Sequence, residues 1–146
     1  MQASLAQALE DMHQRLAETV LDLDQEALDW RLAPGLPAVS DLLAQVAAEE
    51  HHWIAEALAG TPAGWETDNR DLVEQEGAHP LFRLGSTGQF SQVILNNLAP
   101  GEWALERWLD GRPVTVALCI LHVLEELART LGQIEMVAGL WAARRP

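Results

Sequence analysis

The chain has 146 residues, 22 acidic and 9 basic side chains, and a formal net charge of −13 at pH 7. This length is typical of one domain, which we expect to span residues 1–146 and to bury roughly 68–70% of the extended chain's surface. Because an acidic surface repels phosphate, the charge excludes nucleic acid and anionic membranes as partners. Lysine and tyrosine are both absent, so a lysine Schiff base and a tyrosine acid are excluded too.

Apolar residues recur at three- and four-residue steps in the first part of the chain, which predicts amphipathic helices. The first helix is expected over about residues 5–20. The Pro34–Pro37 segment then breaks the chain. Ser40 is the expected N-cap of a second helix over residues 41–59, and Gly60 is placed to end it.

The second part of the chain predicts two more helices. Residues 61–86 form a long connection without a sustained period. A third helix is expected over residues 87–109 with an interruption at Pro100, followed by a turn at 110–113. The last and most apolar helix is expected over residues 114–141. Since no segment alternates at period two, we predict no strands and an all-α four-helix bundle.

The chain has one cysteine, Cys119, so an intrachain disulfide and a thiol–zinc cluster are excluded. It lies in the apolar run 114–121, which favours a buried structural thiol over a nucleophile. The first residues lack the basic flank and apolar run of a signal peptide, and no apolar stretch approaches the ~18 residues of a membrane span. We therefore expect a soluble cytoplasmic protein.

Two helices carry a strip of polar residues beside their apolar face, when they are projected at about 100° per residue. The members are Gln45, Glu49 and His52 on the second helix, and His122, Glu126, Thr130 and Gln133 on the last. A polar strip within an apolar surface is costly unless its members find partners, so it indicates a buried polar network or a ligand site. The alternative interpretation is a polar boundary at the edge of the core.

Two Glu-x-x-His pairs, Glu10 with His13 and Glu49 with His52, have the spacing found in di-iron helical bundles. The two pairs fall on the first and second helices. Glu10 points away from the apolar stripe of its helix, and a di-iron site also needs single glutamates supplied by the other two helices. The spacing alone therefore does not favour a di-iron centre.

Two segments resemble the DinB/YfiT-like family. Residues 40–53 resemble its second helix, which reads roughly Leu-Leu-x-His-Leu-Ala followed by an acidic residue and a tryptophan. Residues 122–133, His-Val-Leu-Glu-Glu-Leu-Ala-Arg-Thr-Leu-Gly-Gln, resemble its fourth-helix signature His-x-x-Glu-Glu-x-Ala-Arg-His-x-Gly-His. The resemblance implies a DinB-like four-helix bundle, commonly homodimeric, with a divalent metal held by one histidine of the second helix and two side chains of the fourth. Better-understood relatives are mycothiol- or bacillithiol-dependent transferases and isomerases, among them the mycothiol-dependent maleylpyruvate isomerase, in which the metal activates the thiol.

The ligand positions that this resemblance implies are Gln45, Glu126 and Thr130. Only Glu126 is a good ligand, because neutral amide and hydroxyl oxygens bind a transition metal poorly. We therefore expect no tightly bound cofactor. Either the metal site has lost its ligands, which we favour, or other residues of the chain hold the metal.

A moved site would use other residues of the two polar strips. His122 lies one turn before Glu126, and Glu49 and His52 extend the strip of the second helix. Such a set could ligate zinc, nickel or manganese if its members converge. His122 and Glu126 are then the metal candidates.

Two hypotheses about function follow. The first is a non-catalytic, stress-associated protein that binds a small molecule or a partner, in which Gln45, His122 and Glu126 form a hydrogen-bonded network. The alternative is a metal-dependent thiol S-transferase or isomerase that takes a low-molecular-weight thiol. In that case Glu126 is a ligand, and His122 is a displaced ligand or an acid–base group. A homodimer is expected under both.

Overall fold

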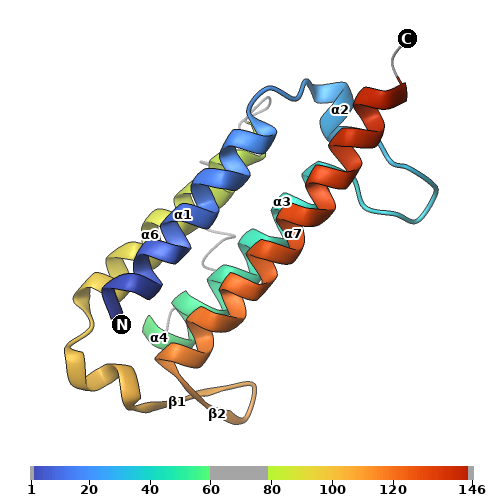
Figure 1. Cartoon of the computed structure of the whole chain (residues 1–146). Coiled ribbons are helices and arrows are strands. Elements are labelled where there is room, and N and C mark those ends of the chain that lie inside the picture. The colour runs from blue at the N-terminus through green and yellow to red at the C-terminus, as the bar shows by residue number, and fades with distance from the viewer. Residues whose placement is uncertain (1, 60–78, 145–146) are drawn as a thin grey trace.

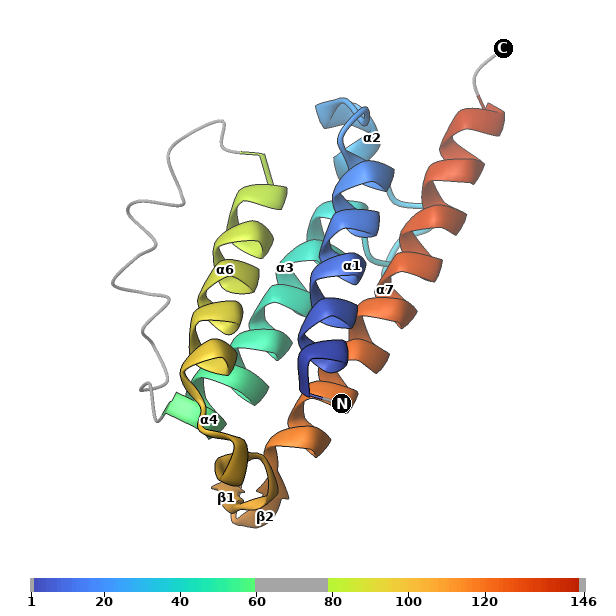
Figure 2. The ribbon, with the colours of Figure 1, turned by 60° about the vertical axis from the view of Figure 1, so that its left-hand side comes forward.

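The computed structural model describes residues 2–59 and 79–144. Four helices form the body of the fold: α1 (Gln2–Val20), α3 (Val39–Glu50), α6 (Leu81–Asn97) and α7 (Val116–Arg144). They run side by side along one long axis, as Figures 1 and 2 show. The predicted all-α four-helix bundle is confirmed.

The four helices are arranged as a square in which each helix packs against two neighbours. α1 contacts α6 and α7, and α3 contacts the same two helices. α1 and α3 therefore face each other across the diagonal of the bundle. Fully buried apolar side chains from all four helices fill the centre, for example Leu9, Leu43, Leu84 and Leu127. Burial of each such side chain contributes about 1.5–3 kcal/mol relative to leaving it exposed.

The start of α3 differs from the sequence prediction. The N-cap residue is Ala38 rather than Ser40, and its backbone N–H donates to the carboxylate of Asp41 at 2.8 Å. Ser40 lies within the first turn and donates to Asp29, the last residue of the short helix α2 (Gln25–Asp29). The N-cap prediction was wrong because it considered only residues whose own side chain can cap, whereas here the carboxylate at the third helical position does so.

The predicted second helix contains an irregular segment. α3 continues into a π-helical turn, η1 (His51–Glu56), and then into α4 (Ala57–Ala59). A π-turn has more residues per turn than an α-helix, so it rotates the side chains that follow out of their expected phase. Gly60, the predicted stop, and residues 61–78 of the predicted long connection lie outside the described residues.

The prediction that the third helix extends to Leu109 and that the chain has no strands was wrong. α6 begins at Leu81 and ends at Asn97, and a 3-10 turn, η2 (Pro100–Ala104), follows. Two four-residue strands, β1 (Glu106–Leu109) and β2 (Arg112–Thr115), then form an antiparallel hairpin at one end of the bundle, as Figure 1 shows. Strands this short offer too few residues for a period-two pattern to be recognised.

The predicted turn after Leu109 is the turn of this hairpin. Asp110 and Gly111 have positive φ angles of 51° and 75°, as a two-residue type I′ connection requires. Asp-Gly is a favoured sequence for such a turn, because aspartate tolerates and glycine readily adopts this conformation. α7 consequently begins at Val116, two residues later than predicted.

Cys119 is buried in α7 with no exposed surface, as predicted. Desolvation raises the pKa of its thiol to about 11, only partly countered by a backbone hydrogen bond. A thiol with so high a pKa is almost entirely protonated at neutral pH and is therefore a poor nucleophile. Among the described helices, none combines the length and the apolar character needed to span a bilayer.

Candidate functional site

The polar strip predicted on the second helix does not stay together. Gln45 is exposed, whereas Glu49 and His52 are half-buried. His52 follows the start of the π-turn, and its ring lies between two carboxylates. Nδ1 lies 2.5 Å from Glu56 Oε2, and Nε2 lies 2.9 Å from Asp110 Oδ2 in the hairpin turn. His52 therefore connects the π-turn to the hairpin.

The protonation of His52 is governed by opposing effects. Desolvation by burial lowers its pKa, but the hydrogen bonds to Asp110 and Glu56 together outweigh it. The pKa is raised above the ordinary value as a result. A protonated His52 donates from both ring nitrogens, so it links the two carboxylates and reduces their mutual repulsion.

The polar strip predicted on the last helix is divided among separate contacts. The ring of His122 lies against Trp53 with centroids 4.1 Å apart and planes inclined by 40°. Glu126 accepts a hydrogen bond from Arg129 at 2.8 Å, and Thr130 is buried. Gln133 is exposed. These contacts leave Glu126 in an ion pair.

Among residues 2–59 and 79–144, no group of three or more His, Cys, Asp or Glu side chains is arranged to hold a metal ion. His52 of η1 and Glu126 of α7 are instead engaged with separate partners. His52 contacts Glu56 and Asp110, whereas Glu126 contacts Arg129. The candidate residues discussed with the family resemblance thus contact different partners.

A buried polar cluster that sequence analysis did not identify lies inside the bundle. Glu50 of α3 has no exposed surface. Its Oε2 lies 2.6 Å from Nε2 of His13 on α1, and its Oε1 accepts a hydrogen bond from Ser91 Oγ on α6 at 2.7 Å. Three helices therefore meet at one carboxylate. Both of its oxygens have partners, as a buried polar group requires.

His13 reaches Glu50 across the diagonal of the bundle because α6 has a glycine where the ring passes. A Cβ at position 88 would lie 2.7 Å from His13 Cε1 and 2.8 Å from Nδ1, closer than such atoms can approach. Only glycine leaves room for the imidazole at this position without a shift of the ring. Gly88 is therefore part of the cluster even though it carries no functional group.

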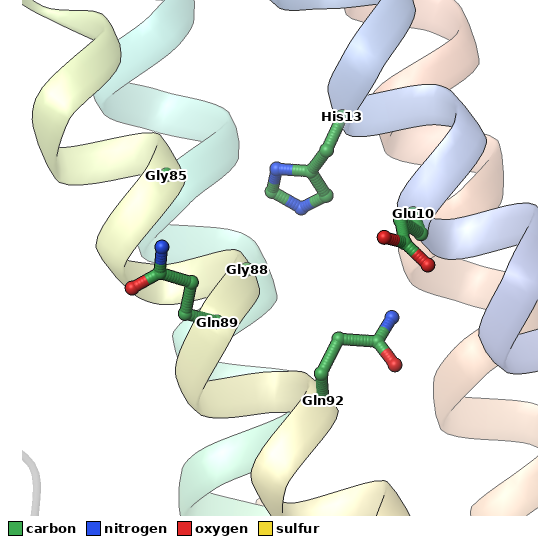
Figure 3. Close-up of a pocket in the computed structure, with 6 residues that line it drawn as sticks. All are labelled: Glu10, His13, Gly85, Gly88, Gln89 and Gln92. Atoms are coloured by element: carbon green, nitrogen blue, oxygen red, sulfur yellow. The ribbon is translucent and has the colours of Figure 1, made fainter.

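The outer side of this cluster opens into a pocket of about 150 Å³ between α1 and α6. Its lining residues are Glu10, His13, Gly85, Gly88, Gln89 and Gln92. Figure 3 shows the ring of His13 projecting from α1 into the space between the two helices, with Glu10 and Gln92 beyond it. The amide nitrogen of Gln92 donates to the Ala6 carbonyl at 3.0 Å, which holds this side chain against α1.

One signal in the sequence could have indicated this cluster. Glu50 falls in phase with the apolar residues Leu43 and Ile54 of its helix, where a carboxylate is costly unless it is paired. Its partners could not be read from the chain. His13 is 37 residues away and Ser91 is 41 residues away.

Comparisons with known proteins give the fold. No family model matches the chain, and no curated protein sequence is similar to it. A DinB-like protein from Bacillus subtilis, YjoA, is 12% identical with a TM-score of 0.75; the match covers 95% of this chain and 92% of that one. A conserved protein from Enterococcus faecalis is 16% identical with a TM-score of 0.79, over 99% and 98% of the two chains. Together with the four-helix arrangement, these similarities show that the chain has the DinB-like fold.

Proposed function

We propose that this protein is a cytoplasmic, stress-associated DinB-like bundle that binds a small molecule or a partner and carries out no metal-dependent reaction at Gln45, Glu126 and Thr130. The observation that carries the proposal is the chemistry of these three residues. Two of them offer only a neutral oxygen, and the third is in an ion pair with Arg129 at 2.8 Å. The buried free thiol of Cys119 is in keeping with a reducing compartment.

The donor set does not fit the divalent metal that the family resemblance implies. Zinc sites use cysteine, histidine or carboxylate ligands, with three protein ligands in catalytic sites. Glu126 supplies one such ligand, but the guanidinium of Arg129 competes for its carboxylate and repels a cation. A metal bound here would need to break this ion pair and accept two weak neutral ligands.

One observation favours the alternative, a metal-dependent thiol S-transferase or isomerase. The rings of His52 and His122 both lie against Trp53, with centroid distances of 6.2 and 4.1 Å. One histidine lies in η1 beside Trp53 and the other in the adjacent helix α7. Among the described residues, the two histidines and Glu126 are not arranged as a metal-binding group.

Metal analysis of protein purified without an affinity tag tests the proposal. We expect no stoichiometric zinc, nickel or manganese, and no rise in the melting temperature when these ions are added. The matched variants are Glu126→Gln and Glu125→Gln, since Arg129 also pairs with Glu125, at 2.9 Å. Near-stoichiometric metal in the wild type and Glu125→Gln but not in Glu126→Gln would overturn the proposal in favour of the metalloenzyme.

We also infer that two copies of the chain associate through α7. Its large exposed apolar side chains fall within about 100° of one another on a helical projection: Leu118, Leu121, Met136 and Leu140. Their exposed fractions range from 40% to 65%. The exposed Glu125–Arg129 ion pair lies between the two apolar patches on this face, and exposed apolar patches rimmed by polar residues are typical of a protein–protein interface.

A further inference from the structure

We propose that the pocket between α1 and α6 binds a small organic cation of the alkylammonium type, through Glu10, Gln92 and His13. This inference deepens the proposed binding function and rests on it, because it gives that function a location and a ligand class. The pocket lies between α1 and α6, and none of Gln45, Glu126 and Thr130 lines it.

The charges around the pocket favour a cation. No lysine or arginine lines it, whereas the carboxylate of Glu10 does. Within the described part of the chain, Glu10 has no hydrogen bond or ion pair, so its carboxylate is available to a ligand. An ammonium group beside this carboxylate would gain a charge-assisted hydrogen bond. An anion would meet the same carboxylate and no lysine or arginine among the lining residues.

The buried Glu50 extends this preference to His13. When Glu50 is ionised, the His13–Glu50 pair has a net charge of zero with the ring protonated and −1 with the ring neutral. The pair therefore adds no net positive charge to the pocket in either state. With a neutral ring, Nε2–H donates to Glu50 and Nδ1 is an acceptor, which suits a ligand that donates hydrogen bonds.

The amide of Gln92 points to the same ligand class. Its nitrogen is engaged with the Ala6 carbonyl, which leaves its oxygen as a further acceptor. With the ring of His13 neutral, Glu10, His13 and Gln92 each offer an acceptor among the residues that line the pocket. A primary ammonium has three N–H donors and no acceptor, so its hydrogen-bonding pattern complements this set.

The volume of the pocket matches a small group. A cavity of about 150 Å³ accommodates a molecule about as large as benzene. A Cβ built at Gly85 meets no atom within 4 Å, so an alkyl chain can pack on the α6 backbone at this position, whereas the His13 ring covers Gly88. A four-carbon ammonium ion suits both features.

A titration with three probes of nearly equal size and different charge tests the inference. Butylammonium, butanol and butyrate are added to isotopically labelled protein at matched ionic strength, and backbone amide shifts are followed by NMR. We expect butylammonium to shift the α1 and α6 amides around the pocket and to saturate, with butanol and butyrate binding at least about fivefold more weakly.

Two matched variants assign the effect to the pocket. Glu10→Gln should weaken butylammonium binding about threefold to fivefold, as expected for one exposed charge pair. Glu18→Gln removes the same charge from an exposed position two turns further along α1 and should leave binding unchanged. Thermal unfolding of both variants verifies that each is folded.

The outcomes distinguish this inference from the function on which it rests. Equal binding of butanol and butylammonium, or no effect of Glu10→Gln, would overturn the cation specificity while small-molecule binding stands. If no probe shifts the α1 and α6 amides, the site itself is refuted. The proposed function fails separately, if the metal analysis finds an ion that depends on Glu126.

Discussion

Gly85 and Gly88 lie one turn apart on α6 and line the same pocket, yet they differ in what a methyl group would meet. A Cβ at Gly85 has no neighbouring atom within 4 Å, whereas one at Gly88 lies 2.7 Å from the ring of His13. The two Gly→Ala substitutions therefore have the same effect on helix propensity and different effects on His13. Their comparison measures what the His13–Glu50 pair contributes to stability.

The expected magnitudes follow from two opposing contributions. Replacing glycine by alanine in a helix interior stabilises the fold by about 1 kcal/mol. At position 88 the new methyl group forces the His13 ring away from the fully buried Glu50, and loss of one partner of a buried pair costs about 3 kcal/mol or more. The net change for Gly88→Ala is a loss of about 2 kcal/mol.

Thermal unfolding of the two variants is the assay. For a domain of this size, 1 kcal/mol corresponds to about 2–4 °C in melting temperature. Gly85→Ala should melt about 2–4 °C above the wild type, and Gly88→Ala about 4–8 °C below it. If both variants are stabilised equally, the His13–Glu50 pair does not hold α1 and α3 together and the reasoning is refuted.

A second background verifies that His13 is the cause. In a His13→Ala protein the side chain that opposes the new methyl group is absent. Gly88→Ala should then stabilise this background by about the same 1 kcal/mol as Gly85→Ala. A persistent loss of stability would mean that some other contact of Gly88 is responsible.

Three further predictions concern the rest of the molecule. Because the pKa of His52 is raised above 6.5, the stability from its pairing with Glu56 and Asp110 is present below that pH and is lost as pH rises through the folded-state pKa. His52→Asn should therefore cost about 0.5 kcal/mol at pH 6 and less at pH 8.5 in urea unfolding, and an equal cost at both would contradict this. Cys119 should react with a thiol reagent only after denaturation, given its burial and a pKa of about 11; rapid labelling of native protein would refute this. Leu121→Arg should convert a dimer into a folded monomer in light scattering, and a monomeric wild type would exclude association through α7.

The sequence alone was enough to predict the helical bundle. The apolar period of α1 and α7 is local, and helices follow from local patterns. The burial of Cys119 was likewise predicted from its place in an apolar run. The hairpin was missed, because the four residues of each strand carry no recognisable alternation and only the Asp110–Gly111 turn indicates it.

The tertiary structure decided which polar residues are brought together. Two doublets, Glu49–Glu50 and His51–His52, show this. The sequence pattern indicates Glu49 and His52 as candidate site residues, but these are half-buried, and the buried members are Glu50 and His51. Adjacent residues on a helix point about 100° apart. Two consecutive side chains can therefore face different neighbouring helices. The π-turn shifts the phase again after Glu50.

By itself, then, the sequence determined the architecture, the acidic surface and the departure from a full set of metal ligands at Gln45 and Thr130. The pairing of Glu50 with His13 and Ser91, and the pocket beside it, became visible only in the folded chain. The physical reason is how far apart along the chain the interacting residues are. Helices form from contacts between residues three or four apart, whereas a buried carboxylate is satisfied by partners 37 and 41 residues away that only the packing of three helices brings within reach.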